Sequence, residues 1–167
     1  MADNFILGFA EYGPVDGKAV FHFNGSGGSR LGGPVDESIL TDLGIRYIFT
    51  DRPGFGISSP VPDRKLQDWP ENVAQLADHL GIDKFHVLGS SAGGAYALIC
   101  AYKLPERIIS GALVSGLAPP DRPKPYRGYS GALMFLLILI RTFPKLAYPI
   151  RRMNAKLFKN LTVKNAD

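Results

Sequence analysis

The feature that most constrains this chain is a five-residue turn, Gly89–Gly93, that lies between two apolar segments. The segment before it, Phe85–Leu88, is short enough to be a buried strand. The small-residue segment after it runs to Cys100 and is long enough to be a helix. The turn reads Gly-Ser-Ser-Ala-Gly and fits the pattern G-x-S-x-G, in which a serine hydroxyl is exposed on a strained strand-to-helix turn. The pattern therefore predicts that Ser91 is a nucleophile.

The residues that flank Ser91 are also suited to a sharp turn between a strand and a helix. A strand that turns sharply into a helix brings Gly89 and Gly93 so close together that a Cβ at either position would clash. The first amides of the following helix, beginning with Ala92, lack an intrahelical acceptor and can stabilise negative charge on an attacked carbonyl. A turn rich in Gly and Ser that merely joins a strand to a helix is the alternative. The flanking strand and helix favour a nucleophile elbow that includes Gly89, Ser90 and Gly93.

The composition is that of a soluble globular protein of about one domain, with 167 residues, 46% of them hydrophobic and 20% charged. The single cysteine, Cys100, excludes an internal disulfide framework and is expected in the core. The N-terminus has neither the basic segment nor the long apolar run of a signal peptide, which predicts a cytoplasmic location. We expect no metal and no cofactor.

Charge divides the chain into two regions. Residues 1–120 contain 9 Lys/Arg and 13 Asp/Glu, whereas residues 121–167 contain 10 Lys/Arg and 2 Asp/Glu. The composition changes near Ala118–Pro120. We therefore predict a core domain over 1–118 and a separate region over 119–167.

Apolar segments and turn residues predict an alternation of strands and helices, which means crossover connections and a mostly parallel sheet with helices on both faces. A turn cluster after the first strand predicts a hairpin-like return to the second. In such sheets ligands bind at the carboxyl ends of the strands, where the loops 24–30, 51–58 and 90–93 fall. The predicted strands are Phe5–Tyr12, Ala19–Phe23, Ile45–Thr50, Phe85–Leu88 and Ile108–Ser115, and the predicted helices are Pro34–Leu43, Trp69–Leu80 and the segment after Ser91.

Two loops allow other interpretations. The glycine-rich loop Asn24–Arg30 could cradle a phosphate, but Gly33 stands where a P-loop needs lysine, and Arg30 replaces the last glycine of a dinucleotide-binding loop. Asp51, at the end of a predicted strand, is either a catalytic carboxylate or a residue that holds the turn through backbone hydrogen bonds. The second interpretation is favoured because aspartates at strand ends more often do this.

Residues 5 to about 120 resemble the α/β-hydrolase superfamily. A strand followed by Asn24-Gly25, the D-R-P-G-F-G motif that starts at Asp51, and G-S-S-A-G around Ser91 carry the resemblance. It implies an oxyanion hole formed by the backbone amides of Ser26 and Ala92. It also implies that Asn24, Gly25 and Asp51 support the loops, with Asn24 in place of the usual histidine. A serine nucleophile is similar to the esterase, lipase and peptidase branches.

The same resemblance shows where this chain departs from the family. Members carry an acid and then a histidine after the nucleophile, yet no histidine follows Ser91. For His22, His79 and His86 a structural or surface role is expected. The resemblance further implies that residues 119–167 are the start of a helical cap, so that the chain is incomplete at its C-terminal side.

The basic C-terminal region has alternative interpretations. Ala132–Ile140 is apolar and is followed by basic residues, but a membrane-spanning helix needs about twenty residues. A cap helix is favoured over a helix on an anionic membrane surface through residues 132–160 and over a nucleic-acid-binding patch.

Two functions remain open at this stage. The first is a serine hydrolase that cleaves a small or medium ester or amide by acyl transfer, with no nucleic-acid partner. The second is a catalytically incomplete relative that binds a ligand or partner at the same site. The sequence does not indicate an oligomeric state.

Overall fold

The structure is a computed structural model that describes residues 5–34, 36–116 and 130–143. The chain forms two compact units, Met1–Leu117 and Ala118–Asp167, each with its own internal contacts. The first unit contains a sheet with helices and carries every predicted site residue. In the second unit the described element is the helix α4 (Gly131–Thr142), which contains the apolar run at 132–140. Most of the predicted cap region lies outside the described residues.

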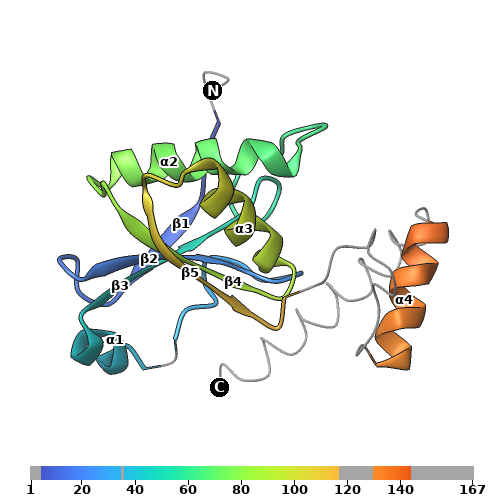
Figure 1. Ribbon diagram of the computed structural model, residues 1–167, viewed down its shortest axis with the longest axis horizontal. Helices are drawn as coiled ribbons and strands as arrows, with labels where there is room; N and C mark the ends of the chain where they lie inside the picture. Colours follow the sequence, from blue (N-terminus) through green and yellow to red (C-terminus); the bar gives the residue numbers. More distant parts are fainter. Residues whose placement is uncertain (1–4, 35, 117–129, 144–167) are drawn as a thin grey trace. The chain divides into compact units, whose positions relative to one another are not determined.

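A five-stranded sheet with the order β1-β3-β2-β4-β5 forms the centre of the first unit (Figure 1). Its strands are β1 (Phe9–Tyr12), β2 (Lys18–Phe23), β3 (Ile45–Thr50), β4 (Phe85–Ser90) and β5 (Ile108–Val114). β1 is antiparallel to β3, and all other neighbouring pairs are parallel. The predicted mostly parallel α/β sheet is therefore confirmed.

The pairing of β1 corrects one prediction. We expected the turn 13–17 to return the chain as a hairpin, but β1 pairs with β3, in the register Phe9↔Thr50. β2 instead lies between β3 and β4. Its alternate residues Ala19, Phe21 and Phe23 are buried, which suits a central strand whose two edges are both taken by parallel neighbours. β1 is more exposed and occupies the edge beyond β3.

The start of the first helix is the second correction. The helix α1 (Ser38–Leu43) begins four residues later than Pro34, where we expected its first turn. The segment before it packs on Tyr12: a Cβ on Gly33 would lie 2.3 Å from the Tyr12 ring, and the Tyr12 hydroxyl donates to the Arg30 carbonyl at 3.1 Å. These tertiary contacts hold the segment in a non-helical path.

The remaining helices pack on the sheet as the apolar pattern predicts. A short 3₁₀ turn, η1 (Leu66–Asp68), leads into α2 (Trp69–His79), and α3 (Gly93–Lys103) follows the Ser91 turn. α2 and α3 lie together on one side of the sheet, and α1 lies on the other (Figure 1). The fully buried side chains between the sheet and this helix pair are aromatic and aliphatic, with Cys100 among them, and they include Phe21, Phe23, Trp69, Val73, Phe85 and Val87. Within the described ranges, no helix has the length and apolar character that crossing a membrane requires.

Candidate active site

Ser91 occupies a strained position between β4 and α3. Its φ of 51° lies in the left-handed region, which is uncommon for a residue other than glycine. Its amide donates to the Val114 carbonyl of β5 at 2.8 Å, and its carbonyl accepts from the Gly94 amide at 3.1 Å. Ala92 is the N-cap residue of α3. The backbone around Ser91 is therefore fixed by the neighbouring strand and by the first turn of the helix.

The two outer glycines of the turn permit its close packing. A Cβ on Gly89 would lie 2.6 Å from the Gly93 carbonyl oxygen, and a Cβ on Gly93 would lie 1.8 Å from the Phe23 carbonyl oxygen. Both contacts are to backbone, which cannot move aside as a flexible side chain can. The prediction that these positions exclude a Cβ is confirmed.

The loop after β2 lies directly against the nucleophile turn. A Cβ on Gly25 would lie 3.0 Å from Cβ and 3.5 Å from Oγ of Ser91. Asn24 is buried, and its Nδ2 donates to the carbonyls of Ser29 at 3.0 Å and Thr50 at 3.4 Å. The side chain of Asn24 thus joins the loop to its own far end and to β3. Ser26, which follows Gly25 in this loop, is exposed.

Arg52 is a component of the site to which the sequence analysis assigned no role. Its Nη2 donates to the Gly25 carbonyl at 2.9 Å. Its guanidinium lies over two aromatic rings, 4.7 Å from the centroid of Phe55 and 5.1 Å from that of Tyr96 on α3. The only signal in the sequence is its place in D-R-P-G-F-G, because Gly25 and Tyr96 come from two segments that are distant along the chain.

Asp51 is fully buried and its carboxylate is enclosed by donors. It accepts from the backbone amide and Nη1 of Arg30, both at 2.7 Å, and from the amide of Ile57 at 3.2 Å. A Cβ on Gly56 would overlap the carboxylate. Asp51 thereby connects the loop after β2 with the loop after β3.

The histidines make contacts with residues other than Ser91. The ring of His22 lies 2.7 Å from the Tyr47 hydroxyl through Nδ1 and 2.9 Å from the Ser90 Oγ through Nε2. Burial lowers the pKa of His22 from 6.5 to about 4, so the ring is neutral at pH 7. His86 contacts the Ser110 hydroxyl at 2.8 Å, and His79 is exposed in the last turn of α2. In the described residues, no histidine forms a hydrogen bond with the Ser91 hydroxyl.

The described residues bring Ser91, Gly25 and the N-terminus of α3 together at the carboxyl ends of the parallel strands. Among the described residues, no titratable side chain forms a hydrogen bond with the Ser91 hydroxyl. Across these residues, no group of three or more His, Cys, Asp or Glu is arranged to hold a metal ion. The arrangement can present a serine hydroxyl next to backbone donors, and the base is the component that it does not contain.

Comparison with known proteins identifies the family to which this fold belongs. Residues 23–133 match the family model described as alpha/beta hydrolase fold. The chain is 37% identical over 112 residues to the 2-hydroxy-6-oxo-6-phenylhexa-2,4-dienoate hydrolase of Comamonas testosteroni, an alignment that covers 63% of this chain and 38% of that protein. It is 41% identical over 84 residues to the proline iminopeptidase of Clostridium botulinum, with 47% of this chain and 28% of that protein covered.

A solved structure gives the same result for the fold. A thermophilic esterase from Thermogutta terrifontis superposes with a TM-score of 0.63 at 26% identity, covering 89% of this chain and 61% of the esterase. The chain spans no more than 44% of the length of the first curated relatives that it matches.

Proposed function

Because this chain belongs to the α/β-hydrolase fold family, we propose that it is the N-terminal part of a serine hydrolase that cleaves a small or medium ester or amide. The observation that carries the proposal is the conformation of Ser91. Its positive φ at a strand-to-helix turn is the geometry that exposes a nucleophilic hydroxyl in this fold. Maintaining such strain requires tight surroundings, which Gly89, Gly93 and Gly25 supply.

The proposed mechanism is acyl transfer. Oγ of Ser91 attacks the substrate carbonyl while a base takes its proton, and the tetrahedral oxyanion accepts hydrogen bonds from the amides of Ser26 and Ala92. The leaving alcohol or amine takes up a proton as the carbon–heteroatom bond breaks, and water then hydrolyses the acyl ester on Ser91. Support for the oxyanion site comes from Gly25, which precedes Ser26 and lies against Ser91, and from Ala92 at the start of α3.

We propose that the base that deprotonates Ser91, and the acid that pairs with this base, belong to a longer form of the chain. None of His22, His79 and His86 contacts the Ser91 hydroxyl in the described part of the structure. Without a base a serine hydroxyl is a weak nucleophile, and the oxyanion site and binding alone leave only about 10³ to 10⁴-fold acceleration over water.

A catalytically incomplete protein that binds a ligand at the same site is the second candidate. The specific observation in its favour is that no histidine of the described residues contacts the Ser91 hydroxyl, although the loop after β2 and the turn at Ser91 are both fixed by their surroundings. A pocket can keep its shape without a base, because Asn24, Asp51 and Arg52 fix the backbone independently of any catalytic step.

Active-site labelling with a fluorophosphonate separates these candidates. We expect little labelling of residues 1–167, and strong labelling of a longer form that supplies an acid and a histidine. In that form labelling should vanish in Ser91→Ala and persist in Ser90→Ala, because the Ser90 hydroxyl is directed to His22 rather than to the substrate side. Persistent labelling in Ser91→Ala would show that Ser91 is not the nucleophile.

Turnover of p-nitrophenyl esters gives an independent measurement. The short chain should not exceed spontaneous hydrolysis appreciably, whereas the longer form should. Robust turnover by residues 1–167 that depends on Ser91 would contradict the proposal that the chain is incomplete, and would assign the base to one of its own histidines or to a partner subunit.

A further inference from the structure

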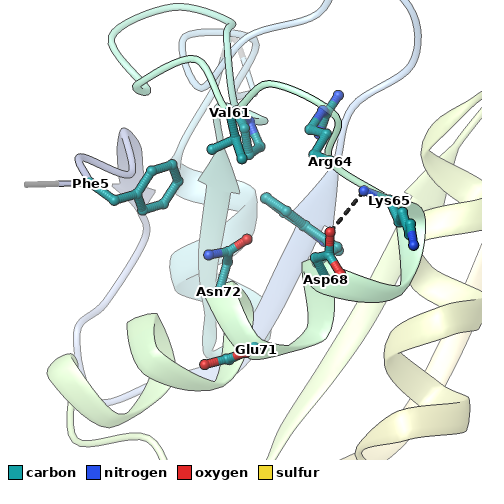
Figure 2. Close-up of a pocket in the computed structure, with 9 residues that line it drawn as sticks. Phe5, Val61, Arg64, Lys65, Asp68, Glu71 and Asn72 are labelled. Atoms are coloured by element: carbon teal, nitrogen blue, oxygen red, sulfur yellow. Dashed lines mark hydrogen bonds between the residues drawn. The ribbon is translucent and has the colours of Figure 1, made fainter. Parts of the chain in front are cut away.

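A pocket in the first unit lies beside the start of α2 and apart from Ser91. Its volume is about 340 Å³, within the range of small-molecule sites. It is formed by Pro53 in the loop after β3, by Phe5 near the N-terminus, and by the segment that leads from Val61 into α2 (Figure 2). Neither Ser91 nor its proposed oxyanion amides line this pocket.

One part of the pocket is apolar. Phe5, Pro53, Val61 and Trp69 line it, and of these Pro53 and Trp69 are buried. The Trp69 ring is held edge-on at 5.6 Å from Phe23 and at 5.6 Å from Tyr96. The Trp69 ring is therefore already packed in place, so that little ordering of this side chain opposes binding.

The other end of the pocket carries positive groups. Arg64 and Lys65 lie at the side opposite Phe5, and Val61 lies between Phe5 and these two residues (Figure 2). Neither cation forms an ion pair within the described part of the chain. The guanidinium of the half-buried Arg64 instead lies 6.0 Å from the Tyr96 ring centroid. A planar guanidinium in this situation is suited to a carboxylate, which it can bind through two parallel hydrogen bonds.

The acidic residues of the pocket already accept hydrogen bonds from neutral donors. Asp68 accepts from the backbone amide of Lys65 at 2.8 Å, the contact drawn in Figure 2. Glu71 accepts from the side-chain amide of Gln75 at 3.1 Å. Asp68 and Glu71 form no ion pair in the described residues either, but each carboxylate has a hydrogen-bond donor. The Arg64 guanidinium differs because it has no hydrogen-bond acceptor among the described residues, which favours an anionic ligand group there.

We propose that this pocket binds a small amphiphilic carboxylate, with its carboxylate at Arg64 and its apolar body between Phe5, Val61 and Trp69. Because the pocket has an apolar end and a cationic end, it selects a molecule that has an apolar body and an anionic group at one end. The proposal does not depend on the assignment of Ser91.

Trp69 is the single tryptophan of the chain, so its fluorescence reports directly on the pocket. The experiment titrates the full chain with octanoate below its micellar range, and with octanamide and octylammonium as uncharged and cationic probes of the same length. We expect a saturable change with octanoate, binding of octanamide that is about tenfold or more weaker, and no saturable change with octylammonium.

Variants identify the contacts. Arg64→Gln should weaken octanoate binding by about tenfold or more and remove the preference over octanamide, and Val61→Asp should abolish binding. Lys84→Gln, which replaces an exposed cation outside the pocket, should bind octanoate like the unmodified chain. Circular dichroism verifies that each variant is folded. No saturable response to octanoate, equal affinity for the three probes, or an unchanged affinity in folded Arg64→Gln would overturn the proposal.

Discussion

His22 lies next to the nucleophile turn, with hydroxyl groups on both sides of its ring. Tyr47 contacts Nδ1 at 2.7 Å, and Ser90 contacts Nε2 at 2.9 Å. A neutral imidazole has one donor nitrogen and one acceptor nitrogen, and two hydroxyls can match either tautomer. A protonated ring would lose the water that solvates its charge in this half-buried place, and its two partners are hydroxyl groups rather than carboxylates. This desolvation by burial is the physical reason for its low pKa.

The low pKa of His22 predicts a pH-dependent stability. Its folded-state pKa of about 4 lies below the ordinary 6.5, so the unfolded chain binds more protons between these values. The contribution of His22 to the free energy of unfolding is therefore complete above about pH 6.5 and is lost as the pH falls toward 4. Urea midpoints measured across this window should decline less steeply in His22→Gln than in the unmodified chain.

The exposed His79 provides the matched control for this measurement. His79→Gln should keep the steep decline, because His79 is exposed in the last turn of α2 and makes none of the contacts of the His22 ring. The difference between variants removes the carboxylate titrations that overlap near pH 4. Equal slopes for His22→Gln and the unmodified chain would show that His22 is protonated normally in the folded protein.

At the scale of elements, local patterns explain the elements and distant contacts explain their arrangement. The strand at Ile45–Thr50 and the start of α2 at Trp69 agree with prediction, since an apolar run and a proline in the first turn are local signals. The pairing of β1 with β3 and the late start of α1 depend on contacts of Tyr12 and on the central place of β2, which no local window contains.

The candidate site shows the same division. The Gly-x-Ser-x-Gly spacing predicts the turn at Ser91, because the strained residue and the two glycines that allow its close packing lie within five consecutive positions. The contact of Arg52 with Gly25 and that of His22 with Ser90 join residues 27 and 68 positions apart. Only the folded sheet brings such residues together, so their roles could not be read from the sequence.

The packing of α3 against β2 predicts a sharp difference between two glycines. In Gly93→Ala the new Cβ would meet the Phe23 carbonyl oxygen at 1.8 Å, so the helix must move away from the strand. We expect the free energy of unfolding to fall by about 1–3 kcal/mol or more, measured by urea denaturation. Gly116→Ala is the control, because a Cβ there meets nothing within 4 Å and should change the free energy by about 0.5 kcal/mol or less. Similar losses in both variants would contradict the close approach of α3 to β2.

At the scale of the whole molecule, the sheet of the first unit ends at β5. Among the described strands it has a neighbour on one side only, β4. Ile109 is 58% exposed and Leu113 is 50% exposed. A parallel strand rich in apolar residues is normally covered, and an open edge offers unpaired backbone groups to another chain.

The exposed edge at β5 predicts that residues 1–167 associate and bind hydrophobic dye. Sedimentation velocity should show a weight-average mass that rises with concentration, and a naphthalene sulfonate dye should gain fluorescence on the unmodified chain. The double variant Ile109→Lys with Leu113→Lys should reduce both signals, because charged side chains on an edge strand oppose pairing with another chain. Leu31→Lys replaces an apolar side chain that is 69% exposed outside the strand, and it should leave both signals unchanged. A monodisperse monomer that binds no dye would show that the edge of β5 is already protected in solution.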